Sequence, residues 1–213
     1  MAIEQVLWDW NETLLDDVRY AIDVRNRTFP AFGLPTVEDV DVYRGQFTFP
    51  VRDYYTSAGV TDENFDAVAH AWMDEYVRGC ADVPLHADAI TTLERVRAAG
   101  MRQVILTASK LDVIQLQLSY YPLDGYFSEV LGLGDIYAHS KEGVGCAYLA
   151  RCGVSPEQSV MLGDTLHDAD VARAMGTRCA LIARGHQRRE ALEAAGVPVF
   201  DTLSAAADWV MEG

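Results

Sequence analysis

Residues 3–17, IEQVLWDWNETLLDD, decide the fold. They begin as a short apolar run that ends in an acid, Asp9, which is the pattern of a buried strand with a polar carboxyl end. Similar apolar runs recur at residues 103–107, 129–133, 159–164 and 178–183, and helical patterns separate them at residues 88–99, 110–120, 141–151 and 168–175. Strands that alternate with helices predict an α/β protein with a doubly wound, Rossmann-like parallel sheet.

The segment after the first strand breaks this alternation. From about residue 15 to residue 82 no strand pattern is present, and apolar residues fall at helical spacing, as at Phe65, Val68, Trp72, Tyr76 and Val77. We therefore expect residues 15–82 to form a small all-helical cap that is inserted after the first strand. Residues 1–14 and 83–213 are then expected to form the core.

Composition narrows the class of partner. The formal net charge of −15 argues against nucleic acid and anionic membranes, because phosphate groups favour clustered Lys and Arg. No apolar run approaches the ~20 residues that span a bilayer, and the first residues lack the basic flank of a signal peptide. The four cysteines follow no zinc-binding spacing and are expected to be buried, reduced thiols. These features predict a cytoplasmic protein that acts on a small molecule, and they leave its oligomeric state open.

Polar side chains follow the predicted strands, where a parallel sheet binds its ligands. They are Asp9, Asn11 and Thr13 after the first strand, Thr107 and Ser109 after the second, Asp164 and Asp168 after the fourth, and Lys141 at the start of the preceding helix. Two carboxylates at strand ends suit Mg²⁺, whereas a hydroxyl, a lysine and backbone N–H groups suit phosphate oxygens. The acids could instead cap helices, but their convergence with Lys141 and Thr107 favours a shared site.

Four motifs carry a resemblance to a known family. WDWNETLLDD (8–17) resembles the first motif of the haloacid dehalogenase superfamily, which usually reads DxDGTLxD. VILTASK (104–110) resembles the second motif, Lys141 in HSKEGVG (139–145) the third, and MLGDTLHDAD (161–170) the GDxxxD fourth. They occur in order across almost the whole chain, and the helical insertion is similar to the cap of the phosphoglycolate-phosphatase-like branch.

This resemblance implies an Mg²⁺-dependent phosphatase for a small phosphorylated metabolite. Asp9 would attack phosphorus and form an aspartyl-phosphate. The transferring phosphoryl group would be bound by Asp9, Thr107, Ala108 and Lys141. The resemblance further implies that Mg²⁺ is held by Asp9, the backbone carbonyl of Asn11 and Asp164, with support from Asp168. Phosphate carries enough negative charge that a carboxylate approaches it only when cations offset the repulsion.

The first motif departs from the family pattern at two positions. Asn11 stands where the family has an Asp that protonates the leaving group, and an amide cannot exchange a proton at neutral pH. Glu12 replaces the usual Gly, and its role is left open. Loss of a general acid costs about 10²–10⁴ in rate. Two functions therefore remain: a phosphatase, and a phosphate- and metal-binding protein with little turnover.

Other reactions of the family fit less well. Phosphonate cleavage needs a cap lysine, which residues 15–82 lack; sugar mutases depend on the Asp that Asn11 replaces; and dehalogenases do not need the GDxxxD motif. In the cap, Arg44 and Arg52, within YRGQFTFPVRDYY (43–55), are candidates to bind an anionic part of the substrate. They could equally be solvated or ion-paired. His186, after the fifth strand, is a candidate border of the crevice with no assigned role.

Overall fold

The computed structural model describes residues 2–213, and six strands form a single parallel sheet. The strands lie in the order β3-β2-β1-β4-β5-β6, so β1 is central and the chain winds outward from it in both directions. Their bounds are β1 Gln5–Trp8, β2 Arg102–Lys110, β3 Glu129–Leu133, β4 Ser159–Gly163, β5 Arg178–Ile182 and β6 Val199–Phe200. The predicted α/β class and doubly wound sheet are confirmed. The edge strand β6 was not predicted, because two residues show no periodicity.

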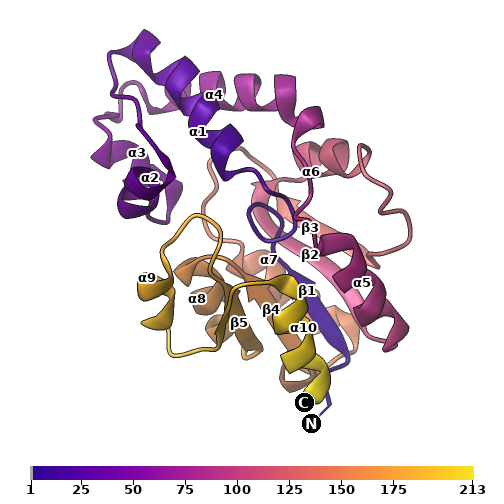
Figure 1. The fold of residues 1–213 in the computed structure, drawn as a ribbon. Helices are drawn as coiled ribbons and strands as arrows, with labels where there is room; N and C mark the ends of the chain where they lie inside the picture. Colours follow the sequence, from indigo (N-terminus) through magenta and orange to yellow (C-terminus); the bar gives the residue numbers. More distant parts are fainter. Residues whose placement is uncertain (1) are drawn as a thin grey trace.

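Helices cover both faces of this sheet (Figure 1). In β1, Val6 and Trp8 point to one face and pack with helices α5 Ala89–Ala98, α6 Leu111–Leu118 and α10 Leu203–Glu212. Leu7 points to the other face, where α7 Glu142–Cys152, α8 Leu166–Met175 and α9 Arg189–Glu193 pack. This alternation follows from the two-residue period of a strand. A strand buried on both faces accordingly reads as a continuous apolar run.

A group of helices lies beyond the carboxyl end of the sheet, drawn in indigo and purple in Figure 1. It comprises α1 Val18–Thr28, α2 Val40–Gln46, α3 Val51–Ser57 and α4 Phe65–Gly79, with 3₁₀ turns at Phe29–Phe32 and Cys80–Asp82. These helices have a hydrophobic core of their own, and the predicted stripe contributes Phe65 and Val68 to it. An all-helical cap after the first strand is thus confirmed. The exact limits at residues 15 and 82 stay a prediction.

The structure tests two expectations from composition, the burial of the cysteines and the lack of a membrane-spanning segment. Cys80 and Cys179 are buried free thiols, whereas Cys152 is half-buried and Cys146 is exposed, so the prediction of buried thiols is wrong at Cys146 and holds only in part at Cys152. Cys146 lies on the outer side of α7, whose inner side is marked by Gly145 and Tyr148. Within residues 2–213, the helices are too short or too polar for any of them to traverse a lipid bilayer.

Candidate active site

Lys141 joins two carboxylates at the carboxyl end of the sheet. Its ammonium nitrogen lies 2.5 Å from Asp9 Oδ1 and 2.6 Å from Asp168 Oδ1. It also donates to the carbonyl oxygen of Leu106 in β2 at 3.0 Å. Asp9 is fixed in turn by its backbone N–H, which donates to Leu162 of β4 at 2.8 Å. All these contacts are buried, so the charges are held in place and shielded from water.

Three carboxylates share this small volume. Oxygen atoms of Asp9, Asp164 and Asp168 lie within 4.8 Å of one another. Burial raises the pKa of Asp9 to about 7, and Asp168 adds to that rise while Lys141 opposes it. For Asp164, burial and then the charges of Asp9 and Asp168 raise the pKa well above its ordinary value. Burial would lower the pKa of the Lys141 ammonium, yet the neighbouring Asp168 and Asp9 raise it overall.

The charge balance of this cluster suits a divalent cation. One ammonium faces three carboxylates, which leaves a net charge of −2 when all are ionised. Oxygen donors from carboxylates are the ligands that Mg²⁺ prefers. Burial, and then the neighbouring carboxylates, raise the pKa of Asp9 and Asp164, and a cation of charge +2 would favour the ionised form of both. The residues predicted as metal ligands therefore fit Mg²⁺ in charge and in donor type.

Glycines and a helix cap position the two acids of the fourth motif. Asp164 Oδ2 accepts a hydrogen bond from the His186 backbone N–H at 2.7 Å. A Cβ at Gly185 would lie 2.0 Å from that same oxygen, so only glycine lets the loop after β5 approach. Asp168 forms a reciprocal capping box with Thr165 at the start of α8. Asp168 thus takes part in capping a helix, which was the alternative to a ligand-binding role, and it also pairs with Lys141.

The predicted phosphate-binding residues lie beside Asp9. Thr107 is 1% exposed, and its hydroxyl oxygen accepts a hydrogen bond from the Ser109 N–H at 3.1 Å. Thr107, Ala108 and Lys141 line the same cavity as Asp9 and Asp164. The structure therefore brings together residues that follow β1 and β4, residues of β2 and the residue that precedes α7, as predicted from the positions of the strand ends. Their roles in catalysis, phosphate binding and metal binding remain proposals.

Asn11 is held by the carboxylate of Asp17, a residue that was not predicted to belong to the site. Its Nδ2 donates to Asp17 Oδ2 at 2.7 Å and to Tyr76 OH at 3.1 Å. The Tyr76 hydroxyl donates to the same Asp17 oxygen at 2.6 Å. Ser109 Oγ donates to Asn11 Oδ1 at 2.7 Å, so the amide orientation is fixed from both sides. Little in the sequence indicated a role for Asp17, which is the second of two adjacent acids at the end of the first motif.

Glu12 adopts a backbone conformation that suits the Gly usually found at this position of the first motif. Its φ is +56°, in the left-handed region that glycine enters without strain. The buried side chain accepts a hydrogen bond from the N–H of Val18, the first residue of α1. Glu12 thereby links the loop that follows β1 to the cap. This gives the replacement of Gly by Glu a structural function.

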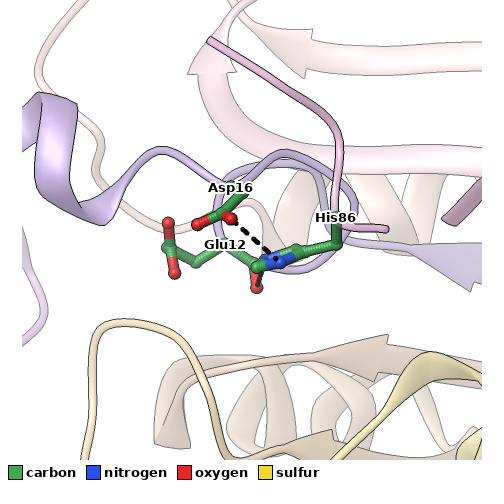
Figure 2. Close-up of side chains that lie close together, drawn as sticks. All are labelled: Glu12, Asp16 and His86. Atoms are coloured by element: carbon green, nitrogen blue, oxygen red, sulfur yellow. Dashed lines mark hydrogen bonds and ion pairs between the residues drawn. The ribbon is translucent and has the colours of Figure 1, made fainter. Parts of the chain in front are cut away.

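A second group of titratable residues lies outside the cavity and consists of Glu12, Asp16 and His86. In Figure 2 the Asp16 carboxylate faces the His86 ring, whereas the Glu12 carboxylate is directed away from it. Asp16 Oδ2 lies 3.7 Å from His86 Nδ1, and His86 Nε2 lies 3.2 Å from the Glu12 carbonyl oxygen. These contacts join the loop that follows β1 to the segment that leads into α5.

The cap closes over the site and leaves a cavity of about 160 Å³. Cap residues that line it are mostly aromatic: Phe29, Tyr43, Phe47, Phe49, Tyr54, Tyr55, Trp72 and Tyr76. His186 also lines it, with Nδ1 2.9 Å from Tyr43 OH and its ring stacked on Phe47. The cavity therefore joins the carboxylate cluster of the core to an aromatic wall in the cap.

The two arginines predicted to bind substrate lie elsewhere. Arg44 donates to the carbonyl oxygen of Gly185 at 2.7 Å and to that of Arg184, so it joins the cap to the core. Arg52 is exposed and pairs with Asp62 at 2.6 Å. Within residues 2–213 neither lines the cavity, whereas Arg25 of α1 does. Nothing in the sequence marked Arg25, because which face of a cap helix points to the core depends on how the cap docks.

Comparisons with known proteins place this geometry in context. The sequence model of the haloacid dehalogenase-like hydrolases matches residues 6–182. Phosphoglycolate phosphatase 1 of Pseudomonas aeruginosa is 24% identical over 208 residues, which cover 93% of this chain and 76% of that protein. The tyrosine-protein kinase PtkA of Mycobacterium tuberculosis is 25% identical over 189 residues, which cover 88% of this chain and 65% of PtkA. A crystal structure described as a predicted phosphatase from Clostridium acetobutylicum superposes over 100% of both chains with a TM-score of 0.88 at 18% identity, which concerns the fold.

Proposed function

This chain belongs to the haloacid dehalogenase-like hydrolase family, and from that premise we propose that it is an Mg²⁺-dependent phosphatase acting on a phosphomonoester of a small metabolite. One observation carries the proposal. The Lys141 ammonium contacts Asp9 within a cluster of three carboxylates, on the wall of a cavity that Thr107 shares. This arrangement offers a nucleophile, oxygen ligands for a cation and donors for phosphate oxygens. A relative of this chain, from Pseudomonas aeruginosa, is named a phosphoglycolate phosphatase.

In the proposed reaction a carboxylate oxygen of Asp9 forms a bond to phosphorus while the bond from phosphorus to the ester oxygen breaks. The Thr107 hydroxyl, the backbone at Ala108 and the Lys141 ammonium hold the phosphoryl oxygens. Water then attacks the aspartyl-phosphate, which releases phosphate and restores Asp9. Asp9, the Asn11 carbonyl and Asp164 would hold Mg²⁺, which would supply positive charge that favours the ionised nucleophile and offsets the charge of the phosphoryl group.

The leaving group must depart without a proton from residue 11. The Asn11 amide donates to Asp17 and Tyr76 and has no proton to give at neutral pH. The proposed substrate is accordingly an ester whose leaving group is acidic. The same observation favours a second candidate function, in which the chain binds phosphate and metal with little turnover.

Asp9→Asn tests the proposal. The amide keeps the shape of the side chain but removes the attacking oxygen, so turnover of phosphate esters should fall by on the order of 10⁴ or more while the fold is retained. EDTA should abolish the wild-type activity and added Mg²⁺ should restore it. Asp170→Asn is the matched control, because Asp170 is an exposed acid on the same helix as Asp168 and pairs with Arg173.

The measurement is the release of inorganic phosphate from a panel of aryl and alkyl phosphates, with and without Mg²⁺. Hydrolysis that persists in Asp9→Asn contradicts the nucleophile assignment, and EDTA-resistant hydrolysis contradicts the metal role. Phosphate binding without measurable turnover on any ester favours the second candidate.

A further inference from the structure

Arg25 is a buried cation without an anionic partner. It projects from α1 and is 3% exposed. Its guanidinium donates to Tyr54 OH and, at 3.4 Å, to the Pro35 carbonyl oxygen, while Nε has no hydrogen-bond partner. Across residues 2–213, no carboxylate forms an ion pair with it. A buried charge is costly unless an opposite charge or further hydrogen bonds offset the lost hydration. Arg25 therefore has unused capacity for an anion, and it lines the cavity that contains Asp9.

The walls around Arg25 are aromatic. Its guanidinium carbon lies 4.8 Å from the centre of the Phe29 ring and 5.0 Å from that of Tyr54. Trp72 and Tyr76, which also line the cavity, stack on each other at 4.8 Å. The cap half of the cavity thus suits one aromatic ring better than a polar sugar.

The core end and the cap end of the cavity suit different chemical groups of one substrate. At the core end, Asp9, Thr107 and Lys141 suit a phosphoryl group, and Asn11 supplies no proton to the leaving oxygen. At the cap end, aromatic rings surround the guanidinium of Arg25. A phenolate leaves without protonation far more readily than an alkoxide. The missing acid and the aromatic wall are independent observations, and both point to an aryl ester.

We propose that the substrate is an aryl phosphate that carries a carboxylate, with its ring in the aromatic cap half of the cavity and its carboxylate bound by Arg25. This inference rests on the proposed function. Asp9 bonds to phosphorus as the bond from phosphorus to the aryl oxygen breaks, and the electron pair leaves on the phenolate. Water then cleaves the aspartyl-phosphate, and its protons pass to solvent and to the released phosphate. Arg25 determines specificity and takes no part in bond breaking.

The test compares phenyl phosphate with 4-carboxyphenyl phosphate, using Arg25→Met and the control Arg52→Met. Arg52 is also a cap arginine over an aromatic ring, Phe65, but it is exposed. In the wild type, kcat/KM should be at least about tenfold higher for the carboxylated ester, since a charged hydrogen-bonded pair contributes a factor of roughly 10 to 100. Arg25→Met should raise KM for that ester by a similar factor, with kcat and the phenyl phosphate values changed less than about threefold. Arg52→Met should change neither ester.

A second measurement needs no variant and is unaffected by any loss of folding in Arg25→Met. 4-Phosphonobenzoate, which cannot be hydrolysed at its carbon–phosphorus bond by this reaction, should inhibit the wild type about tenfold more strongly than phenylphosphonate. Equal inhibition by the two phosphonates, or equal losses on both esters in a folded Arg25→Met, would overturn the assignment of Arg25. Hydrolysis of alkyl phosphates but not of either aryl ester would overturn the substrate class and leave the phosphatase proposal standing. Retained activity in Asp9→Asn would instead remove the proposed function itself.

Discussion

At position 11, two neighbouring groups decide which side chain fits. Asp17 Oδ2 lies 2.7 Å from Asn11 Nδ2, and the Tyr76 hydroxyl donates to that same oxygen. An aspartate at position 11 would place a second carboxylate against Asp17, which is 2% exposed. Like charges this close in a buried site cannot both ionise without a large cost. The first motif therefore contains a hydrogen-bonded pair, in which the Asn11 amide is the donor and the Asp17 carboxylate is the acceptor.

We predict that exchanging this pair restores a general acid, whereas a single substitution does not suffice. Asn11→Asp alone should lower the thermal unfolding midpoint, because it creates the carboxylate contact with Asp17. Asn11→Asp combined with Asp17→Asn keeps one carboxylate and one amide in contact. It should recover the midpoint and raise kcat on alkyl phosphates by about 10² or more. An activated aryl phosphate, whose leaving group needs no proton, should change much less.

Thermal unfolding and steady-state kinetics at saturating Mg²⁺ check this prediction, with kcat and KM measured separately. Asp17→Asn alone is the control, because it alters the partner of Asn11 without supplying an acid. If alkyl phosphate turnover stays flat in the folded double variant, the missing proton donor does not limit the reaction.

Among the secondary-structure elements, those with a buried, repeated pattern were predictable. Five strands and the polar residues at their ends, such as Asp9, Thr107 and Asp164, follow from apolar runs and from the rule that parallel strands end at one edge. Asp17 and Arg25 were not predictable, because the contacts of Asp17 with Asn11 and Tyr76, and the place of Arg25 in the cavity that contains Asp9, depend on how the cap packs on the core. Arg44 and Arg52 lie eight positions apart in sequence, on α2 and α3, and only the docked cap shows that Arg44 contacts the core whereas Arg52 is exposed.

The loop after β5 is an element whose packing positions a proposed metal ligand. A Cβ at Gly185 would lie 2.0 Å from Asp164 Oδ2, so Gly185→Ala must displace either the loop or the carboxylate. We predict that Gly185→Ala raises the Mg²⁺ concentration for half-maximal activity by about 10- to 100-fold, the usual effect of disturbing groups that orient metal ligands. Gly143→Ala on α7 is the control, because its added Cβ would meet nothing within 4 Å. Mg²⁺ titrations of activity check the prediction, and an unchanged half-saturation in a folded Gly185→Ala would contradict it.

In the whole molecule, cap docking and the proposed metal site share one loop. Arg44 in α2 donates to the carbonyl oxygens of Arg184 and Gly185, and Tyr43 contacts the His186 ring. The backbone N–H of His186 donates in turn to Asp164 at 2.7 Å. Figure 1 shows α2 near the loop between β5 and α9, away from the cap's connections to the core near β1. The cap is therefore held at two places, by its covalent connections and by this contact.

Arg44 should act on cap closure and not on substrate identity. Arg44→Ala removes two hydrogen bonds from a charged donor, which weakens the docked state of the cap. We expect KM to rise by roughly tenfold for phenyl phosphate and 4-carboxyphenyl phosphate alike, since the closed cavity is less populated for either ester. Arg52→Ala, at an exposed cap arginine, should leave both values unchanged. Steady-state kinetics on the two esters check this, and limited proteolysis should show faster cleavage between cap and core in Arg44→Ala. A loss confined to the carboxylated ester would mean that Arg44 binds the substrate directly, and the carboxylate would then belong to Arg44 and not to Arg25.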